Sequence, residues 1–350
     1  MKISLLILQP HHLDFFKNLY EELEAKEHNV WCLVRDDEIN RLYLSGSDIK
    51  HTFFGNKPGD HLPKFVHHTR NKLCLISKLL ALRPDLALSV NSLPPSPFNS
   101  IFNTTSVVFL DYKLRKKEER NLFNYADKIV TPDCYPFDVP SNKHVFHPSY
   151  HSLAYLHPNR FNADIQILEQ LSIEPKDYIF VSFAREDWIE GKDQNLLQRR
   201  EKIDIVRALD EHCEVFVDER GSVPEPLKEY IPSVSLDEYN HLLANAKLAV
   251  GDDPIVSSEA GVLGVPWIFI SESTAPTLEE QEVHYEIGTR VADVEEAEKL
   301  AGMILTEEIK PNFQKARRDI LKDKMDLTEW MIKFVKAYQQ TLSDDVKKSK

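Results

Sequence analysis

Short apolar runs alternate with longer amphipathic segments between residues 3 and 130. The runs have the length of buried strands, and the segments between them repeat apolar residues at helical spacing. This alternation predicts βαβ units around a parallel sheet that is covered on both faces. The predicted strands are 3–8, 30–34, 49–54, 86–90, 107–110 and 128–130, and the predicted helices are 13–26, 37–44, 62–82, 96–102 and 116–125.

The alternation stops between residues 132 and 158, where Pro, His, Ser and Asn are frequent and no period is sustained. Such a stretch is typical of the end of a domain and the approach to a linker. The alternation then resumes, and the chain ends in a long amphipathic helix, 313–340, and a polar tail, 341–350. The second set of predicted strands is 178–183, 214–217, 248–251, 267–270 and 288–291, with helices 196–209, 236–246, 255–263 and 295–305.

The length of 350 residues exceeds the usual size of one hydrophobic core, so we expect two domains, 1–150 and 151–312. Both are predicted to be α/β and Rossmann-like. Domains with parallel sheets bind ligands at the carboxyl ends of their strands. The residues that follow the predicted strands are therefore the candidates for chemistry.

The segment after strand 248–251 carries clear helix start and stop signals. Asp253 is a suitable N-cap, Pro254 suits the first turn, and Gly264 and Pro266 mark the end of the helix. The amides at such an N-terminus favour an anion, and Glu259 is placed to accept hydrogen bonds from ribose hydroxyls. The alternative is an ordinary, well-capped crossover helix with an exposed glutamate.

Four segments of the chain resemble GT-B proteins, and most closely the domain-of-unknown-function family three-five-four. The resemblance implies two Rossmann-like domains with parallel sheets facing across a cleft, and a C-terminal helix that crosses back to the first domain. It also implies a relation to glycosyltransferases and non-hydrolysing UDP-N-acetylglucosamine 2-epimerases, but no particular reaction. The segments are 10–23 (PHHLDFFKNLYEEL), 125–132 (YADKIVTP), 153–161 (LAYLHPNRF) and 251–266 (GDDPIVSSEAGVLGVP).

On this resemblance the first domain lies on the acceptor side and the second domain binds the nucleotide sugar. One departure matters, because this chain has Asp253-Pro254-Ile255 where the family has two glycines and a threonine. Pro254 removes an N–H donor and Asp253 places a carboxylate beside a diphosphate, so we expect weaker or rearranged diphosphate binding unless a serine or a cation compensates. The donor-binding residues implied here are Asp252, Ile255, Ser257, Ser258 and Glu259.

Two other strand ends carry polar candidates. After strand 178–183, Arg185 could clamp a phosphate and Trp188 could shape the pocket, as in a similar loop of the family; the alternative is a surface turn whose charges neutralise each other. After the first strand, His12 could act as a general base on an acceptor hydroxyl, with Asp14 orienting it. The alternatives are a solvated loop histidine and an acid that starts the helix.

Metal and cofactor sites are not predicted. The pair His67-His68 and the set His144, His147 and His151 lack the spacing of a metal motif. Asp252-Asp253 could hold a cation with a diphosphate, but adjacent acids at a helix start more often act as caps. The sequence contains no Gly-x-Gly-x-x-Gly after a strand and no P-loop, which disfavours nicotinamide and ATP enzymes. We therefore expect the nucleotide sugar as substrate and no cofactor.

Composition limits the classes of partner that we expect for this chain. The net charge of −13 argues against nucleic acid as a partner, and the four cysteines are too dispersed for a disulfide framework or a zinc ribbon. No signal peptide or membrane span is expected, so the predicted location is cytoplasmic. The helix 62–82 mixes Lys and Arg with Leu and Ile, which allows peripheral membrane contact and a lipid-linked acceptor; an ordinary amphipathic helix packed on the sheet is the alternative.

Three hypotheses follow. The leading one is a GT-B type glycosyltransferase that uses a nucleotide-sugar donor and a glycan or lipid-linked acceptor, in surface polysaccharide biosynthesis. The second is a nucleotide-sugar 2-epimerase-like enzyme, which needs acids and bases around the sugar and no acceptor. The third is a non-catalytic binding protein that kept the GT-B frame, which the Asp253-Pro254 departure favours.

Overall fold

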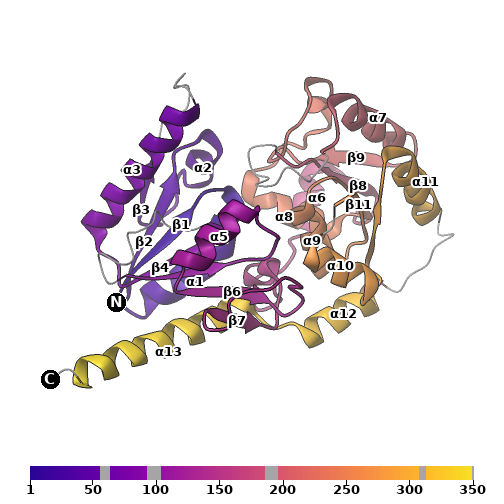
Figure 1. Cartoon of the computed structure of the whole chain (residues 1–350). Helices are drawn as coiled ribbons and strands as arrows, with labels where there is room; N and C mark the ends of the chain where they lie inside the picture. The colour runs from indigo at the N-terminus through magenta and orange to yellow at the C-terminus, as the bar shows by residue number, and fades with distance from the viewer. Residues whose placement is uncertain (56–63, 93–103, 186–195, 274, 307–312, 349–350) are drawn as a thin grey trace. The chain divides into compact units, whose positions relative to one another are not determined.

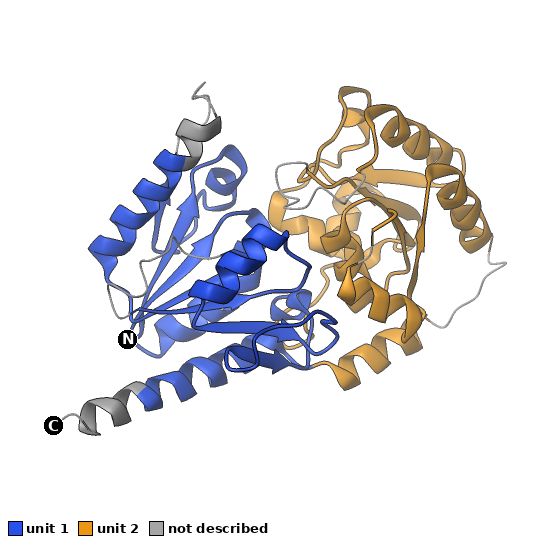
Figure 2. Ribbon diagram, in the orientation of Figure 1, with its two compact units in different colours: residues 1–155, 325–350 blue, residues 156–324 orange. Residues whose placement is uncertain are grey.

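The computed structural model describes residues 1–350 except 56–63, 93–103, 186–195, 274, 307–312 and 349–350 (Figure 1). The chain forms two compact units (Figure 2). Unit 1 contains residues 1–155 and 325–350, and unit 2 contains residues 156–324. The expected helix 96–102 lies outside the described residues.

Unit 1 is built on a parallel sheet of seven strands in the order β3-β2-β1-β4-β5-β6-β7. The central strands are buried on both faces, which explains their continuous apolar runs. Because β2 and β3 lie on one side of β1 and the later strands on the other, the strand order reverses between β1 and β4. The strands are β1 (Lys2–Ile7), β2 (Asn29–Arg35), β3 (His51–Phe54), β4 (Leu86–Val90), β5 (Thr105–Phe109), β6 (Lys128–Pro132) and β7 (His144–His147).

Helices cover both faces of this sheet. Alternate residues of β1 point to different faces: Leu5 and Ile7 belong to the core with α1 and α13, whereas Leu6 packs with α3. Helix α5 covers the second face further along, against Val108 and Ile129. The helices are α1 (Pro10–Ala25), α2 (Glu38–Tyr43), α3 (Lys64–Leu82), α5 (Lys116–Tyr125), α13 (Leu327–Lys348) and the 3₁₀ helix η1 (His151–Ala154).

Unit 2 has a parallel sheet of five strands in the order β12-β11-β10-β8-β9, so its order reverses between β8 and β10. Its core on one face packs α7 and α11 against the strands. The strands are β8 (Tyr178–Ser182), β9 (Glu214–Val217), β10 (Leu248–Gly251), β11 (Trp267–Ile270) and β12 (Gly288–Val291). The helices are α6 (Gln166–Leu171), α7 (Arg199–Asp210), η2 (Glu225–Tyr230), η3 (Leu236–Glu238), α8 (Tyr239–Asn245), α9 (Pro254–Leu263), α10 (Pro276–Val283), α11 (Val294–Leu305) and α12 (Phe313–Asp323).

The C-terminal helix differs from the expectation. The sequence predicted one helix over 313–340, but the structure has α12 in unit 2 and α13 in unit 1. The break is held by Asp326, whose Oδ1 accepts the Glu329 N–H at 3.0 Å. The Met325 N–H donates to the Pro148 carbonyl, and the Met325 carbonyl accepts the Ser149 hydroxyl, so Met325 is bound to the rest of unit 1. An N-cap acid therefore restarts the helix, as capping energetics allow.

The segment 132–158 also differs from the expectation of an irregular approach to a linker. It contains β7, which pairs in parallel with β6, and η1, whose Leu153 and Ala154 are buried. Strand β7 is a short edge strand with one neighbour, and its burial pattern lacks a continuous apolar run. The apolar pattern does not mark such a strand, because an edge strand is only partly buried and needs no continuous apolar run.

Candidate functional site

The strand-order reversal in unit 1 gathers polar residues at the carboxyl edge of its sheet. His11 and His12 follow β1, Asn91 follows β4 and Asp111 follows β5. Open α/β sheets bind ligands at such a reversal, because the adjacent loops diverge and leave a crevice. Asn91 adopts a left-handed conformation with φ 52°, and its amide Nδ2 donates to Asp111 Oδ1 at 2.9 Å. Its Oδ1 accepts the Asp111 N–H at 3.2 Å, so the two strand ends are locked together.

His151 completes this group from η1. Its Nδ1 lies 2.9 Å from Oδ2 of Asp111. Burial by itself would raise the pKa of Asp111, but the charge and hydrogen bond of His151 and the Asn91 amide outweigh it and lower that pKa to about 2. Within the described residues, Nε2 of His151 is buried and has no hydrogen-bond partner. The pair thus presents one uncommitted imidazole nitrogen, oriented by a carboxylate.

Aromatic rings hold His151 in place. The Phe15 ring lies 4.8 Å from the His151 ring, and the buried His147 ring stacks on it at 5.9 Å between centroids. Trp330 of α13 in turn packs against His147 at 5.6 Å and against Phe109 at 6.4 Å. The C-terminal helix therefore contributes to the order of the histidine cluster.

His12 occupies a buried position in the same region. The sequence placed it in a loop before a helix beginning at residue 13, but α1 begins at Pro10, a residue suited to the first helical position. The Leu8 N–H donates to His12 Nδ1 at 3.3 Å. Burial lowers the pKa of His12 well below its usual value, and the charges of His11, Arg35 and His151 lower it further. His12 is therefore neutral near pH 7.

Asp14 also lies within α1 and is half-buried. Residues two positions apart on a helix do not face each other, so the helix does not direct the Asp14 carboxylate at the His12 ring. Asp111 is the carboxylate that contacts His151, and it was not among the residues selected from the sequence. Asp111 and Asn91 directly follow predicted strands, and the strand-end rule that selected His12 could have found them. The catalytic roles of His12 and Asp14 stay predictions.

In unit 2 the N-terminus of α9 is occupied by its own cap. Oδ1 of Asp253 accepts the N–H groups of Ile255 at 2.9 Å and Val256 at 3.4 Å, and Pro254 has no N–H. The N–H and hydroxyl of Ser257 both donate to the Asp253 carbonyl. The first-turn amides that we expected to bind phosphate are thus engaged within the chain. Burial raises the pKa of Asp253 to about 6, and Asp218 and Asp252 contribute, against the capping amides.

Asp252 has a structural position at the reversal between β8 and β10. Its two carboxylate oxygens accept the N–H groups of Ala184 at 2.9 Å and Leu197 at 2.8 Å. Burial raises its pKa, although Lys202 and the backbone amides oppose this. The preceding Gly251 has φ 154°, and a Cβ there would lie 1.8 Å from the Ser182 carbonyl oxygen. Close packing of β8 and β10 therefore requires glycine.

The other predicted donor-site residues surround this edge. Glu259 is buried in α9, not exposed as in the ordinary crossover-helix alternative, and half-buried Ser258 accepts the Gln281 amide through its carbonyl at 3.2 Å. Arg185 is half-buried directly after Ala184. Trp188 lies outside the described residues. Nucleotide-sugar binding by these residues stays a prediction.

Two basic residues that sequence analysis missed also lie in this part of unit 2. Arg220 binds the buried Asp218 carboxylate through Nε and Nη2, and its guanidinium lies 5.3 Å from the Tyr239 ring centroid. Lys202, only 5% exposed, donates to the Ser222 carbonyl at 3.2 Å and lies 5.1 Å from the Phe183 ring centroid. Asp218 directly follows β9, which was the available sequence signal.

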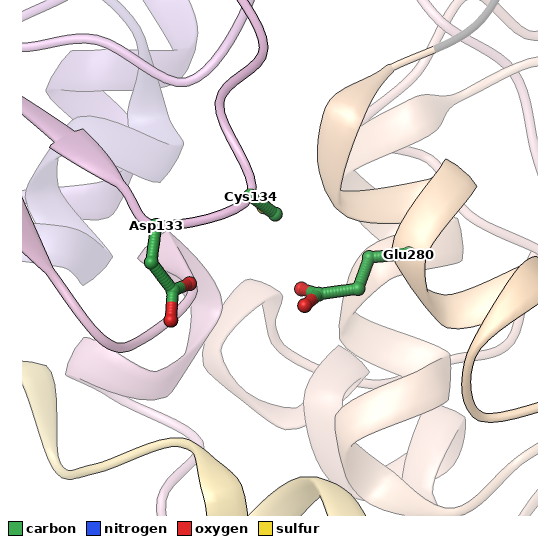
Figure 3. Close-up of side chains that lie close together, drawn as sticks. All are labelled: Asp133, Cys134 and Glu280. Atoms are coloured by element: carbon green, nitrogen blue, oxygen red, sulfur yellow. The ribbon is translucent and has the colours of Figure 1, made fainter.

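Figure 3 draws Asp133 and Cys134 of unit 1 with Glu280 of unit 2. Within unit 2 the Glu280 carboxylate pairs with Lys324 at 2.9 Å. Asp133 follows β6, and its N–H donates to the His147 carbonyl at 3.0 Å. Because these side chains belong to different units, we assign them no metal. In the set His144, His147 and His151, Nε2 of His144 is hydrogen-bonded to Thr131 Oγ1 at 2.8 Å.

Comparison with solved structures finds the same fold along nearly the full chain. UDP-N-acetylglucosamine 2-epimerase from Rickettsia bellii superposes with a TM-score of 0.68 at 13% identity, covering 98% of both chains. The UDP-GlcNAc 2-epimerase from Neisseria meningitidis bound to UDP-GlcNAc gives 0.62 at 12% identity, covering 96% of this chain and 99% of that one. The spinosyn forosaminyltransferase SpnP gives 0.61 at 14% identity, with 96% and 99% covered.

These likenesses define the fold as that of GT-B epimerases and glycosyltransferases, with two Rossmann-like units on parallel sheets. No family model matches the sequence, and no curated protein matches it in sequence. The resemblance to domain-of-unknown-function family three-five-four therefore stays a prediction.

Proposed function

We propose that this protein is a nucleotide-sugar-dependent enzyme that transfers a glycosyl group. The observation that carries the proposal is the Asp111–His151 pair beside the neutral His12 at the strand-order reversal of unit 1. The fold supports it, since a similar structure is named a forosaminyltransferase and another is bound to UDP-GlcNAc. A glycan or lipid-linked acceptor would be the second substrate.

His151 is the general base of the proposed reaction. Its Nε2 takes the proton of the acceptor hydroxyl while Asp111 stabilises the imidazolium through Nδ1. The acceptor oxygen then bonds to the anomeric carbon as the bond to the diphosphate breaks, and the nucleoside diphosphate leaves. His12 is less suited to act as the base, because its Nδ1 already accepts the Leu8 N–H.

Unit 2 is the proposed donor side. Arg185 pairs with the diphosphate and Glu259 with the ribose, while Asp252 keeps its structural bonds to Ala184 and Leu197. The Asp253 cap must yield or bind a proton before a diphosphate can approach the amides of α9, because two anions repel at contact distance. Trp188, Ser257 and Ser258 complete the proposed donor site.

Calorimetry with UDP-, GDP-, TDP- and CMP-sugars tests this proposal on the full chain. We expect one nucleotide class to bind, and Arg185→Ala to weaken that binding at least about tenfold. Arg200→Ala, at a side chain that is 92% exposed in α7, is the matched control and should bind as the wild type does. If no nucleotide sugar binds, the proposal fails and the non-catalytic binding hypothesis takes its place.

Epimerisation of the nucleotide sugar is the second candidate, favoured by the similarity to two UDP-N-acetylglucosamine 2-epimerases. The two reactions differ in their need for an acceptor. Incubation with the bound nucleotide sugar alone, followed by product analysis, separates them. An isomerised sugar indicates the epimerase, whereas an intact donor that is consumed only with an acceptor indicates the transferase.

A further inference from the structure

Helix α3 of unit 1 has an apolar line on its outer side. Its inner side carries Leu75 and Leu79, which are buried in a core with Leu6 and residues of β2 and β3. On the outer side, Leu73 is 62% exposed and Leu80 is 39% exposed. The two leucines are seven residues apart, or two helical turns, so they lie on one line along the helix. They are not part of the cores that the described residues of unit 1 form.

The charged residues of α3 are all cationic. Residues 61–84 contain no Asp or Glu, in a chain whose net charge is −13. Arg70 and Lys72 are exposed in the turn that contains Leu73. The cationic residues of the segment are Lys64, Arg70, Lys72, Lys78 and Arg83.

We propose that the outer face of α3 is a docking surface for an anionic lipid bilayer. The two leucines enter the boundary between headgroups and acyl chains, and the exposed cations Arg70 and Lys72 bind lipid phosphates. A second copy of the chain suits this face less well, because a two-fold contact would bring two sets of cations together. Contact is peripheral: no helix among the described residues has the length and apolar character to span a bilayer.

Vesicle sedimentation tests the proposal on the full chain. We expect binding to vesicles of equal parts phosphatidylcholine and phosphatidylglycerol, no binding to phosphatidylcholine alone, and a bound fraction that falls as salt rises. Lys72→Ala should lower the partition coefficient about fivefold. Leu73→Ser combined with Leu80→Ser should lower it about tenfold.

Two controls match these changes elsewhere on the surface. Leu42→Ser alters a leucine that is 59% exposed on α2, which packs with the α1 side of the sheet, and Arg200→Ala alters an exposed cation of unit 2. Both should bind vesicles as the wild type does, with thermal unfolding unchanged in every variant. Failure of the wild type to bind anionic vesicles at low salt, or equal losses in the controls, overturns the proposal. A Leu73/Leu80 variant that alters the mass at sedimentation equilibrium and leaves vesicle binding intact also overturns it, because a second copy then covers the face.

Discussion

Asp111 and His151 meet through Oδ2 and Nδ1 at 2.9 Å, although one follows a central strand and the other begins the 3₁₀ helix η1. The pair gives His151 an anionic partner on one nitrogen and leaves the other nitrogen for chemistry. The proposed base function of His151 depends on this contact, which can be tested by changing the acid alone.

Asp111→Asn should lower kcat of the proposed reaction at least about a hundredfold, because the imidazolium loses its counter-charge.

The same substitution tests a pH dependence of stability. Since the folded-state pKa of Asp111 is depressed from 3.8 to about 2, its contribution to stability is present above pH 4 and is lost as pH falls toward 2. We expect the variant to lose about 2 kcal/mol of unfolding free energy at pH 7 and less below pH 4. Urea denaturation across this range measures it, with exposed Asp204→Asn as the control. A difference that does not vary with pH would contradict the assigned ion pair.

The raised pKa of Asp253 leads us to expect that its contribution to stability depends on pH in the opposite direction. Its pKa is raised from 3.8 to about 6, so the folded protein binds this proton more tightly and gains stability as pH falls from about 6 toward 4. Asp253→Asn keeps a capping oxygen and should lack that gain. If the diphosphate approaches α9, the affinity of the wild type for its nucleotide sugar should rise about tenfold below pH 6. The variant should bind with similar affinity on both sides of that pH. Calorimetry at several pH values measures these affinities. If the affinity of the wild type did not change with pH, the diphosphate would bind away from the N-terminus of α9.

Asp252→Ala should destabilise unit 2 by about 3 kcal/mol, because the buried N–H groups of Ala184 and Leu197 both lose their acceptor. Denaturant unfolding measures the change, and Asp204→Ala should cost less than about 1 kcal/mol. A small effect would mean that water or another group replaces the carboxylate, and that Asp252 is available to a ligand.

Gly251 and Gly302 form a contrasting pair. A Cβ at Gly251 would overlap the Ser182 carbonyl, whereas no atom of the described residues lies within 4 Å of a Cβ at Gly302 in α11. Gly251→Ala should therefore prevent or strongly impair folding, and Gly302→Ala should raise stability by about 0.5 to 1 kcal/mol. Thermal unfolding compares them. Tolerance of alanine at Gly251 would contradict the close approach of β8 and β10.

The alternation of apolar runs predicted the strands of both units, because central parallel strands are buried on two faces and cannot be polar. Edge strand β7 was not predicted, because it is only partly buried and has no continuous apolar run. The Asp253 cap could be predicted from the sequence, because an Asp followed by Pro254 is a typical helix start. Its consequence, that the cap takes the amides a phosphate would use, follows only from the hydrogen bonds.

The candidate site was less predictable than the fold. His12 was found because it follows a strand, but its burial depends on packing from several elements. The partnership of Asp111 with His151 joins parts of the chain that no local pattern connects. Strand order decides which strand ends become neighbours, and the local pattern of apolar and polar residues does not reveal that order.

Helix α13 belongs to unit 1 although it is made after all of unit 2. Unit 2 is one uninterrupted piece of the chain, residues 156–324, so it can assemble without any later residue. The other unit must wait for Trp330 and its neighbours before the rings around His147 are complete. A nascent chain shortened at its end would therefore carry a finished second half and an open first half.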